Sequence, residues 1–375
     1  MKNRIGIVGG GQLGRMLTLA AKKMGYFVTI LDPTAGSPAG QVADQQIIAT
    51  YSDRKALKIL AEGSDFITFE IELADSTLLH ELSKKNIRIN PHPETLSLIK
   101  DKLAQKTFLR KIKIPVADFM EVDDNKDIEK AARVFGYPLL LKSRFDGYDG
   151  RGNFLVKQKS DIKKGITKLA GRKLYVEKLV PFIKEIAVMV ARSGKNEVMS
   201  YPVVETIHKN NICHMVIAPA QIDSSIQKKA KTLAERVMKH LSGAGVFGIE
   251  MFVTKKDDVL INEIAPRVHN SGHYTIEACV TDQFEQHIRA ITNLPLGSTS
   301  MKVKHAVMIN VLGNRNGVAD IKGLDKVLRV KDATAHIYGK MITRKERKMG
   351  HITVVDSSML RALQKAKKAR NSLSI

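Results

Sequence analysis

Apolar and polar positions along residues 1–93 follow a strand–helix–strand pattern. Apolar segments at residues 4–8, 27–31, 65–69 and 87–90 predict buried strands, because each is short and bounded by glycine, proline or polar residues. Helical periodicity runs from the glycines at 9–14 through Met24 and again over residues 74–85. Strands that alternate with helices are typical of a doubly wound domain with a parallel sheet. The pattern therefore predicts such a domain over residues 1–93.

Beyond residue 93 the pattern changes and predicts a mixed α+β region. Helical periodicity covers residues 95–111, 162–169 and 226–241. Strands at 138–143 and 154–156 flank a glycine-rich loop, and mostly antiparallel strands follow at residues 174–180, 185–191, 199–206, 213–218, 246–253 and 259–264. Residues 297–375 predict a small β module that ends with a basic helix at 359–370.

The composition is that of a globular protein, with 43% hydrophobic and 26% charged residues. The longest apolar runs fall short of the roughly 20 residues that span a bilayer, so we expect no membrane segment. The N-terminal residues have neither the apolar region nor the cleavage site of a signal peptide. Cys213 and Cys279 are the only cysteines, which excludes a disulfide framework and a multi-cysteine zinc site. The cytoplasm is therefore the expected compartment.

The formal net charge of +23 requires an explanation, and residues 297–375 carry about half of it, with 17 Lys and Arg against 5 Asp and Glu. A basic solvated face is one explanation. An anionic small molecule or a nucleic acid is another, because clustered positive charge attracts either. Aromatic residues are only 5% of the chain and Trp is absent, so stacking platforms for bases are scarce. Phosphorylated small molecules are the favoured ligand class.

The glycines at 9, 11 and 14 precede the first predicted helix, and Asp32 ends the second predicted strand. This spacing resembles a dinucleotide-binding fingerprint and would make the chain a nicotinamide-dependent oxidoreductase. Glycines that serve only a tight turn and close helix–strand packing explain the same pattern. The rest of the chain has no second set of residues for hydride transfer, which counts against the oxidoreductase.

A second glycine-rich segment lies between two predicted strands. Lys142 ends the first strand, and Gly147, Gly150 and Gly152 follow within ten residues. Backbone N–H groups in such a loop can fold over phosphates, and a lysine leading into it can neutralise them. An ordinary glycine hairpin is the alternative.

Two glutamates are predicted to face each other across a hairpin. If residues 247–253 and 259–264 turn symmetrically about Lys256 and Asp257 without a bulge, Glu250 lies opposite Glu263 with Cβ atoms about 5 Å apart. Two carboxylates at that distance repel each other, and a Mg²⁺ ion shared with nucleotide phosphates removes the repulsion. A slip of one residue would separate them, and two solvent-facing glutamates remain the alternative.

The segment after this hairpin is rich in polar side chains. His269 and His273 have the i,i+4 spacing of some zinc sites, but the glutamate of the HExxH motif is missing. Arg267 and its neighbours are better suited to holding a small oxyanion. Asn270 or Ser271 could also cap the helix that follows.

Taken together, the motifs resemble the ATP-grasp ligases and, within them, the 5-(carboxyamino)imidazole ribonucleotide synthases of purine biosynthesis. The residues that carry the resemblance are GIVGGGQLGRML at 6–17, TFEIE at 68–72, DKLAQK at 101–106, FDGYDGRGN at 145–153, NEIAPR at 262–267, HNSGHYTIEAC at 269–279 and KMGHIT at 348–353. The order of these motifs is the family's own, and their combination is highly specific.

The resemblance implies three domains: residues 1–93, an ATP-grasp region at 94–296 with a glycine-rich lid at about 112–172, and a C-terminal β domain at 297–375. It implies ATP- and bicarbonate-dependent carboxylation of the exocyclic amine of 5-aminoimidazole ribonucleotide through carboxyphosphate. The implied cofactors are ATP and one or two Mg²⁺ ions, for which Mn²⁺ can substitute. A cytoplasmic homodimer without nucleic-acid or membrane partners is expected, and another ATP-grasp carboxylate–amine ligase is the alternative.

For the nucleotide, the resemblance implies contacts from lysines, the glycine loop, the segment that holds adenine, and acidic residues. These residues are Lys102, Lys142, Gly147, Tyr148, Asp149, Gly150, Arg151, Gly152, Asn153, Glu177, Lys178, Leu179, Val180, Glu185, His208, Asn262 and Glu263. Glu185 would hold the ribose hydroxyls. The implied metal ligands are Glu250 and Glu263, in agreement with the hairpin argument.

For the acceptor, the implied contacts are Glu70, Tyr148, Arg151, Arg267, His269, Asn270, Ser271, Lys340 and Arg347. Arg267 would hold bicarbonate, His269 would receive the amine proton, and Lys142 would stabilise the phosphoryl charge. The chain departs from the family pattern at Val268, where proline is usual, and at 340–348, which lacks the usual Pro-Gly. These departures leave open which basic residue of 340–348 binds the ribotide phosphate.

Overall fold

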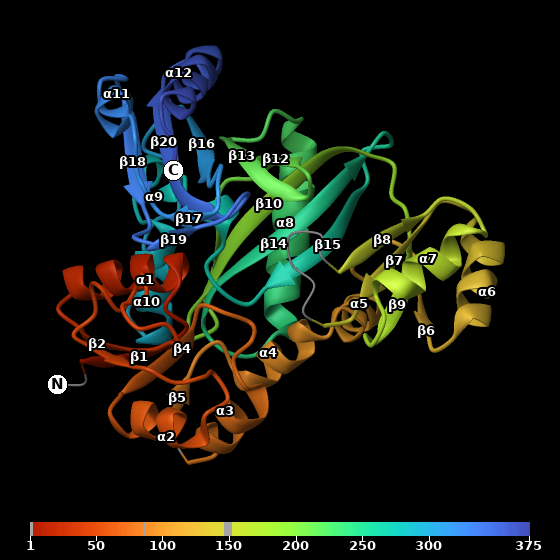
Figure 1. Ribbon diagram of the computed structural model, residues 1–375, viewed down its shortest axis with the longest axis horizontal. Coiled ribbons are helices and arrows are strands. Elements are labelled where there is room, and N and C mark those ends of the chain that lie inside the picture. The colour runs from red at the N-terminus through yellow and green to blue at the C-terminus, as the bar shows by residue number, and fades with distance from the viewer. Residues whose placement is uncertain (1–2, 86, 146–151) are drawn as a thin grey trace.

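The computed structural model describes residues 3–85, 87–145 and 152–375. Figure 1 shows an N-terminal sheet with helices on both sides, a long central sheet, and a smaller sheet with its own helices at one end. Among the described residues, no helix has the length and apolar character needed to cross a bilayer.

The N-terminal sheet is parallel and has the strand order β3-β2-β1-β4-β5, which confirms the expected doubly wound fold. Its strands are β1 (Arg4–Val8), β2 (Phe27–Leu31), β3 (Gln45–Ile47), β4 (Phe66–Phe69) and β5 (Arg88–Ile89). One face packs on α1 (Gln12–Lys23), and the other packs on α2 (Arg54–Glu62) and α3 (Ser76–Ser83). The sequence pattern did not predict α2 and β3.

The helix predicted over residues 95–111 is wrong, because the structure has two helices there. They are α4 (Pro93–Lys100) and α5 (Lys102–Lys111), separated at Asp101. Asp101 has an extended backbone, and its carboxylate accepts hydrogen bonds from the backbone N–H groups of Leu103 and Ala104. This cap starts a new helix and places Lys102 at its first position.

A four-stranded sheet with the order β6-β9-β7-β8 forms the part of the chain at the right of Figure 1. Its strands are β6 (Phe119–Val122), β7 (Leu139–Ser143), β8 (Asn153–Val156) and β9 (Leu174–Lys178), covered by α6 (Asn125–Phe135) and α7 (Asp161–Lys168). The glycine-rich loop joins β7 to β8. Lys142 pairs with Asn153 in the ladder, and the Ser143 N–H donates to the Gly152 carbonyl at 2.8 Å, so both ends of the loop meet.

The central sheet is continuous from strands of residues 182–265 into the C-terminal segment, with the order β15-β14-β10-β12-β13-β16-β20-β18 and β11 on β10. Its strands are β10 (Phe182–Arg192), β11 (Val198–Ser200), β12 (Val204–Lys209), β13 (Ile212–Ala218), β14 (Gly245–Thr254), β15 (Val259–Ala265), β16 (His305–Leu312), β18 (Ala333–Ile337) and β20 (Lys348–Asp356). The join is the antiparallel pair β13–β16.

Helices and short elements complete this region. They are α8 (Ser224–His240), the 3-10 helix η1 (Asn270–Gly272), α9 (Thr275–Ala278), α10 (Gln283–Ile291), α11 (Leu324–Leu328), α12 (Met359–Asn371) and the strand pair β17 (Gly317–Val318) and β19 (Ile342–Thr343). Helix α10 packs against α1 and β14 and so joins the N-terminal domain to the central sheet.

Candidate active site

The two glutamates at the centre of the sequence argument are paired in the β14–β15 ladder, as predicted. The assumption of a ladder without a bulge was wrong, however. Near the turn Val253 pairs with Val259 and Phe252 with Leu260, so the turn is centred half a residue earlier than assumed. A bulge at Asn262 then restores the register, and Glu250 meets Glu263.

The electrostatics of this pair suit a divalent cation. Burial and then the neighbouring Glu263 charge raise the pKa of Glu250 to about 7. Burial would also raise the pKa of Glu263, but an ion pair with Lys102 outweighs it and lowers that pKa. No group of three or more potential metal ligands (His, Cys, Asp or Glu) occurs in the described part of the chain. A cation here would therefore need oxygens from a bound ligand in addition to the two carboxylates.

A second charged group lies beside the first and contains a residue that the sequence argument missed. The carboxylate of Glu177 is buried between two ammonium groups, at 2.7 Å from Lys142 Nζ and 2.5 Å from Lys106 Nζ. Burial would raise the pKa of Glu177, but the two lysines lower it to about 2. Lys106 belongs to the 101–106 motif, but the sequence does not show that its side chain is buried.

The expected adenine and ribose contacts lie on strands that are consecutive in the chain but belong to different sheets. Glu177 ends the buried part of β9, and residues 178–180 lead from it into β10. The carboxylate of Glu185 on β10 forms an ion pair with Nδ1 of His208 on β12. Burial would lower the pKa of His208, but Glu185 raises it. The structure thus brings these two expected nucleotide contacts together.

Five of the expected loop contacts lie outside the described residues: Gly147, Tyr148, Asp149, Gly150 and Arg151. Gly152 and Asn153 lie at the start of β8, beside Lys142.

The first glycine turn binds carboxylates of its own domain. The backbone N–H groups of Gly11 and Gly14 donate to the buried Glu70 carboxylate at 2.7 and 3.3 Å. Gly10 N–H donates to Asp32 at 2.8 Å. The turn therefore already has anionic partners at the N-terminus of α1, where a dinucleotide would place its pyrophosphate. This arrangement counts against the oxidoreductase and places Glu70 beside the Arg267 charge.

Arg267 follows β15 and faces the N-terminal domain. Its Nη2 lies 3.1 Å from Glu72 Oε1, and its Nε is buried with no hydrogen-bond partner among the described residues. An unused guanidinium N–H in a buried position is suited to an anionic ligand. Glu72 belongs to the 68–72 motif but was not predicted as a site residue.

His269 and its neighbours differ in how their side chains are used. The ring of His269 lies between Ser271, at 2.8 Å from Nδ1, and Glu250, at 3.6 Å from Nε2. Burial and then the Arg267 charge keep the pKa of His269 well below its usual value. The amide of Asn270 instead exchanges hydrogen bonds with Asn310 of β16, at 3.0 and 2.6 Å. Asn270 thus holds the C-terminal strand against the site.

The basic residues of 340–348 lie in different surroundings. Lys340 Nζ donates to the Lys348 carbonyl at 2.6 Å and lies 5.7 Å from the centre of the Tyr338 ring. Arg347 is exposed and donates to the Ile342 carbonyl at 2.5 Å. After burial and the Arg267 charge, the charge of Lys348 also lowers the pKa of His269, so Lys348, one of the basic residues left open at 340–348, acts on the site electrostatically.

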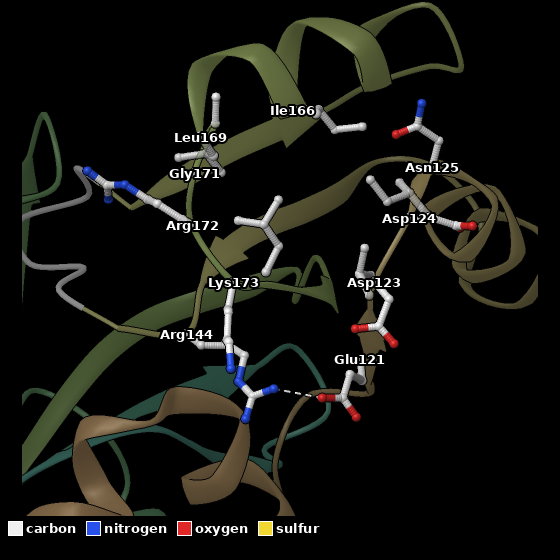
Figure 2. A pocket seen from close by; sticks show the side chains of 14 residues that line it. Glu121, Asp123, Asp124, Asn125, Arg144, Ile166, Leu169, Gly171, Arg172 and Lys173 are labelled. Carbon is white, nitrogen blue, oxygen red and sulfur yellow. Dashed lines mark hydrogen bonds and ion pairs between the residues drawn. The ribbon is translucent and has the colours of Figure 1, made fainter.

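A hollow of about 460 Å³ lies away from these residues, between the β6–α6 turn and the segment from α7 to β9 (Figure 2). Acidic side chains of Glu121, Asp123 and Asp124 line one side of it, and Arg172 and Lys173 lie on the other. Arg144, whose Nη1 lies 2.7 Å from Glu121, also pairs with Asp101 at 2.5 Å. Arg144, which lines the hollow, thereby holds Asp101, the residue that caps α5 just before Lys102.

Three protein families match successive parts of the chain. Residues 1–100 match the ribonucleotide synthetase preATP-grasp domain, 107–284 the ATP-grasp domain, and 306–365 the phosphoribosylaminoimidazole carboxylase C-terminal domain. Relatives match over nearly the whole chain. The N5-carboxyaminoimidazole ribonucleotide synthase of Bacillus subtilis is 40% identical over 93% of this chain and 90% of its own length. The phosphoribosylaminoimidazole carboxylase of Ogataea methanolica is 48% identical over 95% of this chain.

This chain spans 64% to 67% of the length of the fungal carboxylases that it matches. Solved structures match it from end to end. The N5-carboxyaminoimidazole ribonucleotide synthetase of Thermotoga maritima has a TM-score of 0.91 and 48% identity over 99% of both chains. The Aspergillus clavatus N5-carboxyaminoimidazole synthase in complex with ADP and 5-aminoimidazole ribonucleotide has a TM-score of 0.92 and 37% identity, over 99% of this chain and 98% of its own. The chain therefore belongs to the N5-carboxyaminoimidazole ribonucleotide synthase family of ATP-grasp proteins.

Proposed function

We propose that this protein carboxylates the exocyclic amine of 5-aminoimidazole ribonucleotide, using ATP and bicarbonate and releasing ADP and phosphate. The observation that carries the proposal is the Glu250–Glu263 pair beside Lys102 and Lys142. Such a group of charges fits the phosphates of a nucleotide and a divalent cation. The names and ligands of the relatives support the same substrates.

Bicarbonate is a poor electrophile, so the reaction begins by activating it. The γ-phosphoryl group of ATP is transferred to a bicarbonate oxygen, which gives carboxyphosphate and ADP. Lys142 stabilises the charge on the phosphoryl group from its position beside Glu177 and opposite Asn153 in the ladder. Lys102, which forms an ion pair with Glu263, contributes a second positive charge to the phosphate oxygens.

Glu250 and Glu263 would hold Mg²⁺, or Mn²⁺ in its place. The fit rests on the raised pKa of Glu250, since that carboxylate favours a proton when no cation is near. When bound, the metal supplies positive charge that offsets the charge on the phosphates.

The second half of the reaction joins carbon to nitrogen. The bond from the carboxyl carbon to the phosphate oxygen breaks, the bond from the amine nitrogen to that carbon forms, and the amine loses one proton. Arg267 holds bicarbonate through its guanidinium group, whose Nε is unpartnered among the described residues. His269, which is neutral because its pKa is low, receives the amine proton, and its ring is held by Ser271 Oγ at 2.8 Å from Nδ1. Lys340 and its basic neighbours hold the ribotide phosphate.

The remaining parts of the proposal rest on the family resemblance. They are a cytoplasmic homodimer without nucleic-acid or membrane partners, and domains at 1–93, 94–296 and 297–375 with a lid at about 112–172. The loop residues Tyr148 and Arg151, the segment 177–180 and Asn262 belong to the substrate contacts in the same proposal.

Coupled measurement of ADP release tests the function. We expect ADP to form only when ATP, bicarbonate and 5-aminoimidazole ribonucleotide are all present. ADP release that is indifferent to the ribotide would contradict the proposal and indicate another carboxylate–amine ligase reaction.

A further inference from the structure

A buried glutamine of α10 binds the backbone of the loop that follows the metal-site hairpin. Gln283 has no exposed surface. Its Nε2 donates to the carbonyl of His269 at 2.8 Å, and its Oε1 accepts from the N–H of His269 at 2.9 Å. Because one backbone group is a donor and the other an acceptor, only this orientation of the amide satisfies both.

These two bonds fix both backbone polar groups of a single residue. The same Nε2 lies 3.1 Å from Nδ1 of His273, which is also fully buried, so the amide contacts the loop at two positions. There is no spare room around it: a Cβ on Gly272 would lie 2.4 Å from Gln283 Oε1. The backbone of the 267–271 loop is thus held against α10, which itself packs on α1 and β14.

The side chains on this loop point toward the reacting groups. Arg267 faces Glu72, and the His269 ring lies between Ser271 and Glu250. A shift of the His269 backbone would move both side chains relative to the Glu250–Glu263 pair. Misplacement by about 1 Å can cost on the order of 100-fold in rate.

The same helix contains an equivalent amide that binds far from these groups. Gln286 is also fully buried, its Nε2 donates to the Gly297 carbonyl at 2.8 Å, and its Oε1 accepts from the Gly297 N–H at 2.8 Å. The two glutamines thus make the same pair of bonds to the backbone of one residue. They differ in what that residue is: His269 lies in the candidate site, and Gly297 lies in the connection between α10 and β16.

We propose that Gln283 is a positioning residue for the carboxylation, which holds the Arg267–Ser271 loop in its reactive arrangement through the His269 backbone; this inference rests on the proposed function. Gln283 does not touch the substrates. It acts through His269 and, by way of the loop, through Arg267. Gln286 stabilises the fold through the same pair of hydrogen bonds, but it has no part in positioning the candidate site.

The test compares Gln283→Met with Gln286→Met, since methionine keeps the length of the side chain and removes the amide. Both variants should lose thermal stability, because each loses two buried hydrogen bonds to the backbone of one residue, and Gln283→Met also loses the contact with His273 Nδ1. Only Gln283→Met should lower kcat for ribotide- and bicarbonate-dependent ADP release, by about 10- to 100-fold. The KM for ATP should stay within about twofold in both, because neither amide contacts the nucleotide residues.

Two results would overturn the inference. One is a folded Gln283→Met protein whose kcat lies within twofold of the unmodified chain, and the other is an equal loss of kcat in both variants. If either methionine variant does not fold, Gln283→Asn and Gln286→Asn give the same comparison. Asparagine keeps the amide, but its side chain is too short to reach the backbone groups that glutamine binds. Failure of the proposed function itself would appear differently, as an unmodified chain without ribotide-dependent ADP release.

Discussion

The two sides of the candidate site are held together by different forces. On the nucleotide side, Lys102, Lys106 and Lys142 are each paired with a buried or half-buried carboxylate. On the acceptor side, neutral amides fix the backbone of the loop, through Gln283 on His269 and through the Asn270–Asn310 pair, and Arg267 pairs with a carboxylate, that of Glu72. The nucleotide side must therefore exchange ionic partners when its ligands bind, whereas the acceptor loop is already arranged. This difference predicts that substitutions on the two sides will fail in different ways.

The largest effect is expected for Glu263→Gln. The substitution removes one half of the carboxylate pair, and ADP release should fall by at least about 100-fold. The loss of stability should be small, about 1 kcal/mol, because the Glu263 side chain is 34% exposed, and the loss of its pair with the buried Lys102 is offset by relief of the repulsion with Glu250. Steady-state kinetics and thermal unfolding measure the two quantities. Glu62→Gln, at an exposed surface position, is the control, and full activity in Glu263→Gln would refute the metal site.

Lys106→Met should have the next largest effect and should act through the nucleotide. Without Lys106, Glu177 is left with Lys142 alone, and Lys142 is then less available to phosphate. We expect kcat/KM for ATP to fall about tenfold and the free energy of unfolding to fall by about 3 kcal/mol, because a buried charge loses a partner. Denaturant unfolding and ATP titration give both values. Unchanged kcat/KM for ATP would show that Lys106 has only a structural role.

Substitution of the two expected phosphate contacts should separate their roles. Lys340→Met should raise the KM for the ribotide about fivefold, because the Lys340 ammonium lies beside Tyr338 and close enough to Glu70 to oppose the rise in pKa that burial causes there. Arg347→Met should change it less than twofold, since Arg347 is exposed and bonded to the Ile342 carbonyl. Ribotide titration of both variants makes the comparison, and the reverse order would transfer the phosphate contact to Arg347.

The last comparison concerns stability and not activity, and it separates two regions by pH. Burial lowers the pKa of His287 from 6.5 to about 3, and the ring is bonded neutral between Thr68 and Val246. The unfolded chain binds the proton first as the pH falls, so this contribution is present above pH 6.5 and is lost toward pH 3. The His287 contribution to the free energy of unfolding should change by roughly 1.4 kcal/mol per pH unit in that window.

On the nucleotide side the corresponding window is lower. The pKa of Glu177 is depressed from 4.5 to about 2, so its contribution is present above pH 4.5 and is lost toward pH 2. Between pH 4.5 and 7 Glu250, whose pKa burial raises to about 7, contributes a slope of the opposite sign, and Glu177 lies below the window. The His287 contribution is therefore measured as the difference in urea unfolding between the unmodified chain and His287→Gln. A His287→Gln variant should flatten the stability profile in this range, and an unchanged slope would contradict the assignment.

The sequence predicted the main elements because they follow simple periodicities. The parallel order of β1, β2, β4 and β5 follows from buried runs that alternate with helices. The facing of Glu250 and Glu263 was also predicted, but two errors cancelled: the turn is centred half a residue earlier, and a bulge at Asn262 compensates. Hydrophobic alternation does not reveal a bulge, because one extra residue in an apolar strand leaves little trace in the pattern.

Other features depend on contacts between distant segments. The break at Asp101 was missed because aspartate is acceptable within a helical pattern as well as at its cap. Lys106 was missed as a site residue because a lysine on a helix is usually solvated, and its partner Glu177 is far away in the sequence. The same holds for Gln283, whose role appears only when α10 lies beside the loop at His269.

The continuity of the central sheet limits how this chain can be divided. Strand β13 has β12 on one side and β16 on the other, so it is an interior strand only while the C-terminal segment is present. Truncation after residue 296 would expose the N–H and C=O groups of residues 215–218 along a free sheet edge, beside the apolar side chains of Met215 and Ile217. Such an edge is a template for aggregation. The shortened protein should therefore be insoluble unless the missing strands are supplied as a separate polypeptide.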